Sequence, residues 1–509
     1  MINVRSVFTL ILSATFVLGM VYLNRDFCFD RADQNKDEGE AAEEDVRRER
    51  KNDNSIVFES NDECEDGDFS EEDKESEDIC GKKDSKSSES NCFIPVPENL
   101  LCTLVTNQKH SSIFESIESI RKNWQNVSSF AERELKKSRK THFRVLLTGG
   151  AGFIGSHTLV LLLERGYHVT VLDNLSNGSV DVLSHVCKIT GTCIKSEILH
   201  FQEIDLLDIT KLDRFLRGVD KFDFCIHFAG LKSVGESEQS PLKYYDNNVT
   251  GTLNLLRVLE RYNCKNFIFS SSATVYGSQE APFDESMITG VGITNAYGRS
   301  KYVVEEILKD FFQAKKRECG QEQDKKTHKQ TQTEPRQVGW NIVILRYFNP
   351  AGAHSSGFIG ETPLGVPQNL VPFLTQFFAG KREKFVIHGV DYDTKDGFCM
   401  RDFIHVMDLA EGHLKTLEFI LKNASLEQVE VFNLGSGTPI SVLEMFRTMQ
   451  KISGEKKFYS VGRRRPGDVA VSLASVEKAN RVLGWKTTKT IEDMCRDAWN
   501  WEKHRETIF

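Results

Sequence analysis

The stretch Thr148-Gly149-Gly150-Ala151-Gly152-Phe153-Ile154-Gly155 decides the fold of this 509-residue chain. It follows an apolar run over residues 143–147 and precedes a helical pattern over 157–164, so its glycines lie at a strand-to-helix turn. Such a turn lets the backbone approach a pyrophosphate, which the first amides of the helix then bind. We assign the tight turn and close approach to Gly150 and Gly152, and the helix-to-strand contact to Gly155. The stretch therefore predicts a dinucleotide-binding site.

A carboxylate after the next strand specifies the cofactor. The apolar run over residues 169–172 ends in Asp173, at about the distance where an acid binds the ribose hydroxyls of NAD. A carboxylate there repels the 2′-phosphate of NADP, so we expect NAD. A glycine-rich turn of an unrelated α/β protein is the competing interpretation of the motif taken alone.

Tyr297-Gly298-Arg299-Ser300-Lys301 carries candidate proton-transfer groups. On a helix, Tyr297 and Lys301 share one face, and a buried ammonium beside a phenol stabilises the phenolate. The apolar run over residues 267–269 leads into a serine-rich strand end, where the Ser272 hydroxyl can bond the same substrate oxygen as Tyr297. A surface Tyr and Lys on an ordinary helix would be the alternative if the spacing stood alone.

These residues and several further segments resemble the extended short-chain dehydrogenases/reductases and, among them, the UDP-glucose 4-epimerases. The resemblance runs from about Arg144 to Trp501. The further segments are Phe228-Ala229-Gly230-Leu231-Lys232, Val234-Gly235-Glu236-Ser237, Tyr244 to Asn248, Ser271 to Gly277, Arg346 to Pro350, Arg401 to Leu409 and Asn433 to Gly437.

The resemblance implies reversible oxidation at C4 of a UDP-hexose, with NAD restored in each cycle. Tyr297, Lys301 and Ser272 would be catalytic, and no metal is expected. The residues implied to bind NAD are Gly149, Gly152, Phe153, Ile154, Gly155, Asp173, Asn174, Asp205, Leu206, Phe228, Ala229, Gly230, Leu231, Lys232, Asn247, Tyr297, Lys301 and Phe348. Those implied to bind the UDP-sugar are Lys232, Ser272, Tyr297, Asn349, Asn369, Leu370, His388, Arg401, Arg465, Asp468 and Ser472.

Two residues implied to bind the UDP-sugar bear on which sugar is accepted and how it is held. His388 stands where an aromatic ring is expected to stack on uracil, and an imidazole stacks more weakly. Ser472 occupies the position that gates the sugar pocket, and its small side chain predicts room for an N-acetyl group. We therefore expect UDP-GlcNAc and UDP-GalNAc to be interconverted as well.

Other functions stay open at this stage. A UDP-xylose or UDP-glucuronate 4-epimerase, or a UDP-glucuronate decarboxylase, would use the same cofactor chemistry. A catalytically inactive NAD-binding scaffold is a different class, which the presence of Tyr297, Lys301 and Ser272 disfavours.

The order of predicted elements indicates a two-part α/β enzyme. Alternating strands and helices over 141–349 predict a Rossmann-like doubly wound parallel sheet that binds NAD. The Gly- and Pro-punctuated region 350–509 predicts a smaller mixed α/β domain for the UDP-sugar. The polar stretch 315–337 is longer than a usual connection, and we expect a surface insertion there. Homodimerisation is implied by the resemblance alone.

The N-terminal third differs in composition from the enzyme region. Within residues 1–24, an uncharged apolar run over 7–23 predicts a single membrane anchor, with a cleaved signal peptide as the alternative. Residues 25–110 form an acidic stem that cannot bury enough apolar surface to fold. Within 111–140, apolar residues from Ile113 to Val127 recur at helical spacing and predict an amphipathic helix.

The net charge and the cysteine content limit the partners and the cellular location that the sequence allows. The net charge of −9 argues against nucleic acid as a partner. Of the 12 cysteines, those in the enzyme region have no metal-ligand spacing, and pairing of those in the stem would mean a luminal location, so cytoplasm and secretory lumen both stay open. A glycosylation sequon at Asn174 adjoins the predicted ribose site, which mildly favours the cytosolic side of a membrane.

Overall fold

The computed structural model describes residues 143–194, 196–326, 339–423, 425–465 and 468–508. The predicted anchor (1–24), acidic stem (25–110) and amphipathic helix (111–140) lie outside these residues. In the part of the chain that the structure describes, no helix is long and apolar enough to cross a membrane.

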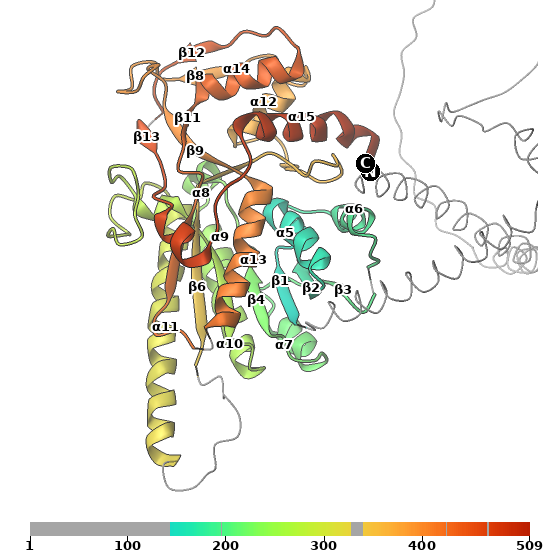
Figure 1. Ribbon diagram of the computed structural model, residues 1–509, viewed down its shortest axis with the longest axis vertical. Coiled ribbons are helices and arrows are strands. Elements are labelled where there is room, and N and C mark those ends of the chain that lie inside the picture. The colour runs from blue at the N-terminus through green and yellow to red at the C-terminus, as the bar shows by residue number, and fades with distance from the viewer. Residues whose placement is uncertain (1–142, 195, 327–338, 424, 466–467, 509) are drawn as a thin grey trace, which may run out of the picture. The chain divides into compact units, whose positions relative to one another are not determined.

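A seven-stranded sheet forms the centre of the NAD-binding region (Figure 1). Its order is β10-β6-β5-β4-β1-β2-β3, and every neighbouring pair is parallel. The strands are β1 (Arg144–Thr148), β2 (His168–Asp173), β3 (Leu199–Glu203), β4 (Phe224–His227), β5 (Asn266–Ser272), β6 (Asn341–Tyr347) and β10 (Glu430–Leu434). The order reverses between β1 and β4, which is where ligands bind in open parallel sheets.

Helices cover both faces of this sheet, so its inner strands β4, β5 and β6 are buried at every residue. One face carries α5 (Phe153–Glu164), α6 (Val180–Thr190) and α13 (Val406–Lys422). The other carries α7 (Ile209–Arg217), α10 (Gly251–Arg261) and α11 (Ala296–Lys326). Successive residues of a strand point to opposite faces, and accordingly Leu147 belongs to the first core and Leu146 to the second.

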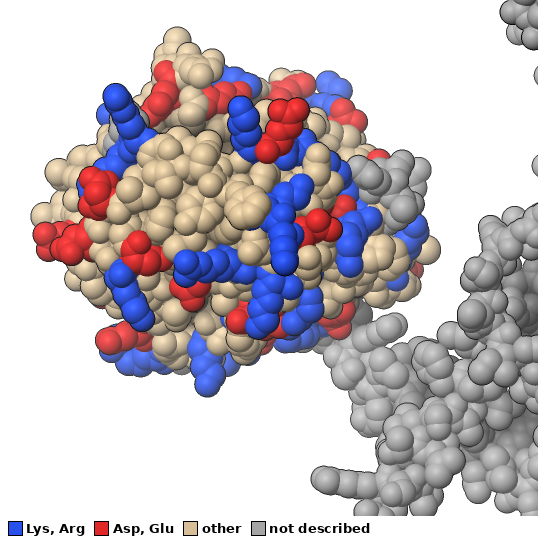
Figure 2. All heavy atoms as spheres, turned by 90° about the horizontal axis from the view of Figure 1, so that it is seen from above, with Lys and Arg blue, Asp and Glu red and all other residues tan. Residues whose placement is uncertain are grey.

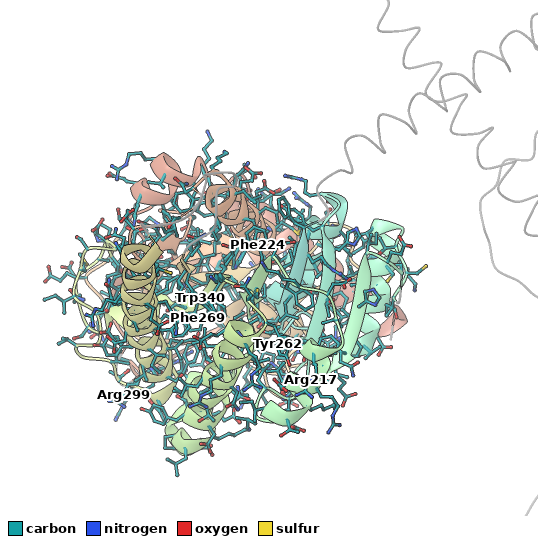
Figure 3. The ribbon with its side chains drawn as sticks, turned by 90° about the horizontal axis from the view of Figure 1, so that it is seen from below. Arg217, Phe224, Tyr262, Phe269, Arg299 and Trp340 are labelled. Atoms are coloured by element: carbon teal, nitrogen blue, oxygen red, sulfur yellow. The ribbon has the colours of Figure 1, made fainter. Side chains whose placement is uncertain are left out.

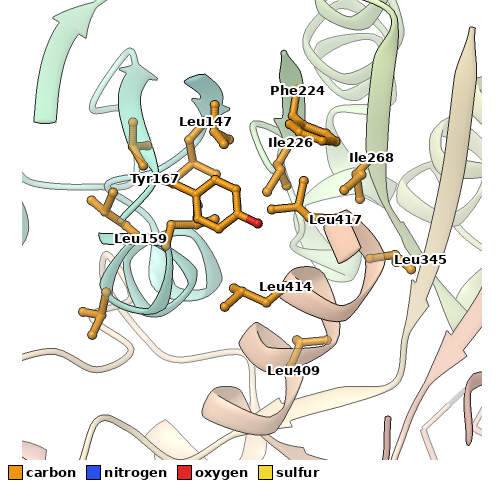
Figure 4. Packing of buried hydrophobic residues seen from close by; sticks show 14 of the residues in the cluster. Leu147, Leu159, Tyr167, Phe224, Ile226, Ile268, Leu345, Leu409, Leu414 and Leu417 are labelled. Carbon is orange, nitrogen blue, oxygen red and sulfur yellow. The ribbon is translucent and has the colours of Figure 1, made fainter. Parts of the chain in front are cut away.

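The first core joins all seven strands to α5, α6 and α13. Leu147, Ile226, Ile268 and Leu345 project from β1, β4, β5 and β6, and Figure 4 shows them beside leucines of α5 and α13. In the second core, Phe269 and Trp340 lie between the sheet and its helices (Figure 3). Packing in the two cores fixes the position of each helix along the strand direction, relative to the strand ends.

Short helical segments connect these elements near the carboxyl ends of β4 and β5. They are α8 (Val234–Gln239), α9 (Pro241–Tyr244), the π-helical η1 (Tyr245–Thr250) and the 3-10 helix η2 (Ala273–Tyr276). Both α9 and η1 pack against α11.

The remaining elements build a smaller mixed α/β region. A four-stranded sheet has β9 (Met400–His405) paired antiparallel with β11 (Pro439–Ser441) and parallel with β7 (Asn349–Ala351) and β13 (Val471–Ser472). Strands β8 (Val386–His388) and β12 (Ser460–Gly462) form a parallel pair, and α12 (Leu370–Phe378), α14 (Val442–Ser453) and α15 (Ile491–Ile508) complete the region. The π-helical η3 (Ala479–Leu483) instead packs into the first core of the large sheet, against α13 and β10. Its core is rich in phenylalanine, including Phe377, Phe385 and Phe446.

The predicted fold class, a Rossmann-like parallel sheet with a smaller mixed domain, is confirmed. The division at Asn349 stays a prediction. Strand β10 and helix α13 come from beyond it, yet β10 pairs with β6 and α13 packs against α5. The segment 315–337 begins as a continuation of α11, which ends at Lys326, and residues 327–338 lie outside the described ranges.

Charges of both signs mix on the face seen from above. Lys and Arg side chains lie among Asp and Glu around a tan area (Figure 2). This distribution differs from the continuous basic stripe with which proteins follow a nucleic-acid backbone.

Candidate functional site

The glycine turn between β1 and α5 lies at the switch point of the sheet. Gly149 has φ +70, and a Cβ there would lie 2.6 Å from the backbone N of Ala229, after β4. A Cβ at Gly155 would collide with the carbonyl oxygen of Gly149. Both positions therefore require glycine: a side chain at Gly149 would push the turn away from the segment after β4, and one at Gly155 would push α5 away from the turn.

The sequence assigned the tight turn to Gly150 and Gly152, and the structure corrects this. The left-handed residue is Gly149, because the chain must reverse immediately after β1 to start α5. Gly150 instead packs against β2, where a Cβ would lie 2.8 Å from Val171 Cγ1. Gly152 is the N-cap of α5 and has no side chain to accept from the first-turn amides. Those amides point toward a ligand position suited to a pyrophosphate.

The residues predicted to bind the ribose of NAD lie together at the ends of β2 and β3. Asp173 accepts from Ala151 N at 3.0 Å and from Leu175 N at 2.9 Å. Burial raises the pKa of this carboxyl, while those backbone bonds act in the opposite direction. Asn174 Nδ2 donates to Asp205 Oδ2 at 2.9 Å, so the segments that follow β2 and β3 are joined by a side-chain hydrogen bond. Leu206 follows at once, and its side chain is buried.

The segment Phe228 to Lys232 after β4 passes over the glycine turn and reaches the start of α11. A Cβ on Gly230 would lie 3.4 Å from Lys301 Nζ. Asn248 holds the segment: its Oδ1 accepts from Leu231 N at 2.8 Å, and its Nδ2 donates to Leu231 O at 3.0 Å. Asn247 donates to the same Oδ1 at 3.0 Å.

Tyr297 and Lys301 lie in the first turns of α11, facing the end of β5. Lys301 Nζ donates to the carbonyl of Ser270 at 2.7 Å, and Ser272 ends the same strand. Arg299, between them in sequence, points outward from the helix (Figure 3). The predicted catalytic residues are therefore brought together by α11 and β5.

The protonation of this group follows from burial. Burial lowers the pKa of the Lys301 ammonium to about 8. Burial also raises the pKa of Tyr297, against which a hydrogen bond with Ser272 acts. Ser272 Oγ further accepts from Thr274 N at 3.2 Å, which fixes its rotamer. The phenol is thus neutral in this state, and a further positive charge is needed to favour its phenolate.

Several residues predicted to bind the UDP-sugar lie on the small sheet and its adjoining loops. Arg401 Nη2 donates to Asp468 Oδ1 at 3.0 Å, and its Nη1 donates to Val469 O at 2.9 Å. Ser472 on β13 lies directly opposite Arg401 on β9 in the strand register. His388 ends β8, and its Nδ1 lies 3.1 Å from Arg463 O. Arg465 is exposed, and its carbonyl accepts from Asp468 N at 3.2 Å.

A buried acid links the two regions. Glu361 Oε1 accepts from Lys232 Nζ at 2.6 Å and from Asn369 Nδ2 at 2.8 Å. Lys232 also lies 5.8 Å from the centre of the Phe153 ring. Asn349 Nδ2 donates to the carbonyl of Asp402 at 2.8 Å, at the start of the small sheet.

The remaining predicted residues lie where these groups adjoin. Phe348, between β6 and β7, is buried with its ring 6.2 Å from that of Phe283. Leu370 begins α12 directly after Asn369, and Ile154 lies in the first turn of α5, partly buried against the first core.

Sequence reasoning missed Glu361 as a member of the site and assigned Asn248 no role. Each is buried, and each bonds to a predicted site residue or segment. The signal available for Glu361 was an acid in the turn-rich segment Gly360-Glu361-Thr362-Pro363. That signal is weak, because surface loops carry acids frequently.

Comparison with known proteins places the chain in a family. Residues 145–435 match the family model described as "NAD dependent epimerase/dehydratase family". The chain is 47% identical over 359 residues to UDP-glucose 4-epimerase 2 of Arabidopsis thaliana, covering 70% of this chain and 94% of that protein.

Solved structures are similar over the same region. UDP-glucose 4-epimerase from Bifidobacterium longum, in complex with NAD+ and UDP, has a TM-score of 0.62 and 42% identity, covering 72% of this chain and 100% of that one. The UDP-Glc/GlcNAc 4-epimerase from Campylobacter jejuni has a TM-score of 0.58 and 35% identity, covering 71% of this chain and 99% of that one. The chain therefore belongs to the NAD dependent epimerase/dehydratase family, in which it is similar to the UDP-glucose 4-epimerases.

Proposed function

We propose that this chain interconverts UDP-glucose and UDP-galactose by reversible oxidation at C4 of the sugar. The arrangement of Tyr297 and Lys301 on α11, facing Ser272 at the end of β5 and adjoining the glycine turn, carries the proposal. The names of the relatives support the same reaction.

The residues at the switch point fit NAD. The turn at Gly149 has no space for a Cβ, the α5 N-terminus has no side-chain cap, and Asp173 and Asp205 suit ribose hydroxyls. Bound there, NAD would supply reversible hydride transfer at C4 of the sugar. The Tyr297 phenolate needs a further positive charge beside it, which oxidised NAD would supply.

Tyr297 moves the proton. As phenolate it takes the proton of the sugar 4-hydroxyl, and as phenol it returns that proton to the oxygen of the 4-keto sugar. Lys301 stabilises the phenolate from one turn further along the helix, and Ser272 donates to the same sugar oxygen. Epimerisation requires the 4-keto sugar to turn between the two transfers, so the sugar must be held less firmly than the nucleotide.

The nucleotide is held by the small sheet and its loops. Arg401 and Arg465 suit the diphosphate because guanidinium forks bind phosphate oxygens in pairs. Asp468 orients Arg401 through their 3.0 Å bond. Asn349, Asn369, Leu370, His388 and Lys232 complete the binding set that we propose.

Epimerisation of UDP-galactose by the purified chain tests the function, with UDP-glucuronate and UDP-xylose assayed separately. We expect UDP-glucose as the product and no release of CO2 from UDP-glucuronate. Replacement Tyr297→Phe should abolish epimerisation while leaving NAD bound. Activity of this variant near that of the unchanged protein would refute the mechanism.

N-acetylated sugars are a second substrate pair. Ser472 is small and lies opposite Arg401 in the strand register, and this small side chain supports space for an N-acetyl group beside the proposed diphosphate site. We expect UDP-GlcNAc to be turned over, and the replacement Ser472→Tyr to remove that activity while retaining UDP-galactose turnover. Turnover of UDP-galactose without any turnover of UDP-GlcNAc would contradict this part of the proposal.

The chain is anchored in a membrane by residues 7–23, with its enzyme region in the cytosol. The apolar run supports the anchor. Two sequon asparagines support the cytosolic side: Asn248 is buried with its Nδ2 bonded, and Asn174 Nδ2 is bonded to Asp205. A glycan on either would break the NAD site.

Carbonate extraction and endoglycosidase treatment of expressed full-length protein test this placement. We expect retention in the membrane pellet, an intact N-terminus and no mass change on deglycosylation. A soluble protein that lacks residues 1–24 would favour the cleaved signal peptide instead.

The active form is a homodimer that pairs through the surface around α11. Leu242 on α9 and Ile288 and Val291 before α11 are 75%, 72% and 64% exposed. These apolar side chains lie on segments that pack against α11, since α9 contacts it and Gly290 lies against its Tyr302. Sedimentation should give a dimer that Leu242→Asp weakens, while Phe458→Asp on a distant loop does not.

A further inference from the structure

A third titratable side chain, that of Glu305, shares the face of α11 that carries Tyr297 and Lys301. Glu305 follows Lys301 by four residues, so the three side chains form one stripe along the helix. Glu305 is 0% exposed. A buried carboxylate is costly unless it is paired and hydrogen-bonded, so its partners define what it does.

Those partners lie on two neighbouring strands. Glu305 Oε1 accepts from Ser271 Oγ at 2.5 Å and from Arg346 Nε at 3.0 Å, and its Oε2 accepts from Arg346 Nη2 at 2.7 Å. Ser271 on β5 and Arg346 on β6 are directly opposite in the register. One carboxylate thus fastens α11 to both strands.

The hydrogen bonds of the Arg346 guanidinium continue on the side that faces away from Glu305. Arg346 Nη1 donates to Tyr276 Oη at 2.9 Å, and Tyr276 Oη donates to Asn433 Oδ1 at 2.7 Å. These bonds tie η2, which follows Ser272, to β10. All of these groups are buried, so water does not compete for them.

Ser271 stands between the two residues of β5 that serve the catalytic group. The carbonyl of Ser270 accepts from Lys301, and the hydroxyl of Ser272 bonds Tyr297. Three consecutive serines of β5 therefore contact one face of α11: Ser272 bonds Tyr297, the Ser270 carbonyl accepts from Lys301, and Ser271 donates to Glu305. A slip of α11 along β5 would break these contacts together.

We propose that Glu305 is a positioning residue, which holds α11 at the height on β5 where Tyr297 meets Ser272 by binding Ser271 and Arg346. The inference rests on the function proposed above. It goes beyond that function by assigning a kinetic role to a group that touches neither substrate nor cofactor.

The replacement Ser271→Ala tests the link without leaving a buried charge unpaired. In the full chain we expect kcat for UDP-galactose to fall about tenfold with KM within twofold, because orientation and not binding is lost. The acidic limb of the kcat–pH profile should move to higher pH, since Tyr297 loses part of its contact with Ser272. Ser271→Thr keeps the hydroxyl and should restore kcat.

A second replacement and two controls separate positioning from simple destabilisation. Glu305→Gln keeps the shape and an acceptor oxygen, and it should lower kcat at least as much as Ser271→Ala. Thr416→Ala removes a buried hydroxyl of α13 that donates to Gly412 O at 2.8 Å, and it should lower the melting temperature without changing kcat. Unchanged kcat and pH profile in both Ser271→Ala and Glu305→Gln would overturn the inference.

Tyr297→Phe distinguishes failure of the positioning role from failure of the proposed function. If it is inactive while Ser271→Ala and Glu305→Gln behave like the unchanged protein, only the positioning role fails. If it epimerises normally, the proposed function fails first.

Discussion

Replacement of Lys301 by methionine should stabilise the NAD-free protein at neutral pH while removing its activity. Burial lowers the Lys301 pKa from 10.5 to about 8, and each tenfold change corresponds to ~1.4 kcal/mol, so keeping this ammonium charged costs the fold about 3 kcal/mol. Methionine avoids this cost but leaves the Ser270 carbonyl without its donor, a loss of ~1–2 kcal/mol. The expected net gain in unfolding free energy is about 1–2 kcal/mol at pH 7.

The pH dependence of that gain is diagnostic. The unfolded chain keeps the lysine proton up to about pH 10.5, whereas the folded chain releases it near pH 8. Because the unfolded state then binds more protons, the stability contribution from Lys301 rises with pH between these values. The advantage of Lys301→Met should therefore shrink between pH 8 and 10.

Urea unfolding of the NAD-free protein at pH 7 and pH 10, followed by tryptophan fluorescence, measures this difference. Lys309→Met, on a more exposed part of the same helix, is the matched control and should show no such pH dependence. A Lys301→Met variant that is equally destabilised at both pH values would refute the reasoning.

Three further results are expected. Gly149→Ala should weaken NAD binding at least tenfold in a titration, because its φ is +70 and its Cβ would meet Ala229 N; unchanged affinity would contradict the turn assignment. Arg401→Gln should raise KM for UDP-galactose by about 10- to 100-fold with kcat nearly constant, and a fall in kcat alone would argue against nucleotide binding. Burial lowers the pKa of His227 to about 3 and of His413 to about 4, so the unfolded chain gains protons first on acidification. The unfolding free energy should drop by about 2 kcal/mol for each between pH 6.5 and 5, and equal stability at the two pH values would exclude this.

The sequence alone determined the parts of the site that depend on local geometry. The glycine turn, Asp173 at a strand end, and the four-residue spacing of Tyr297 and Lys301 are all set by short segments whose secondary structure the hydrophobic pattern predicts. The resemblance supplied residues such as Arg401 and Asp468, which the structure joins by a hydrogen bond.

Only the tertiary structure decided which distant residues meet. The left-handed residue Gly149 lies against the segment that follows β4, where a Cβ would meet Ala229 N, and no local pattern reports that contact. Strand β10 joined the sheet from beyond the predicted boundary, since its pairing with β6 is set by a partner 87 residues away in register. Glu361 and Glu305 read as ordinary acids in the sequence. Burial against Lys232 and Arg346 makes them central, because a carboxylate removed from water must find its charge partners wherever the fold places them.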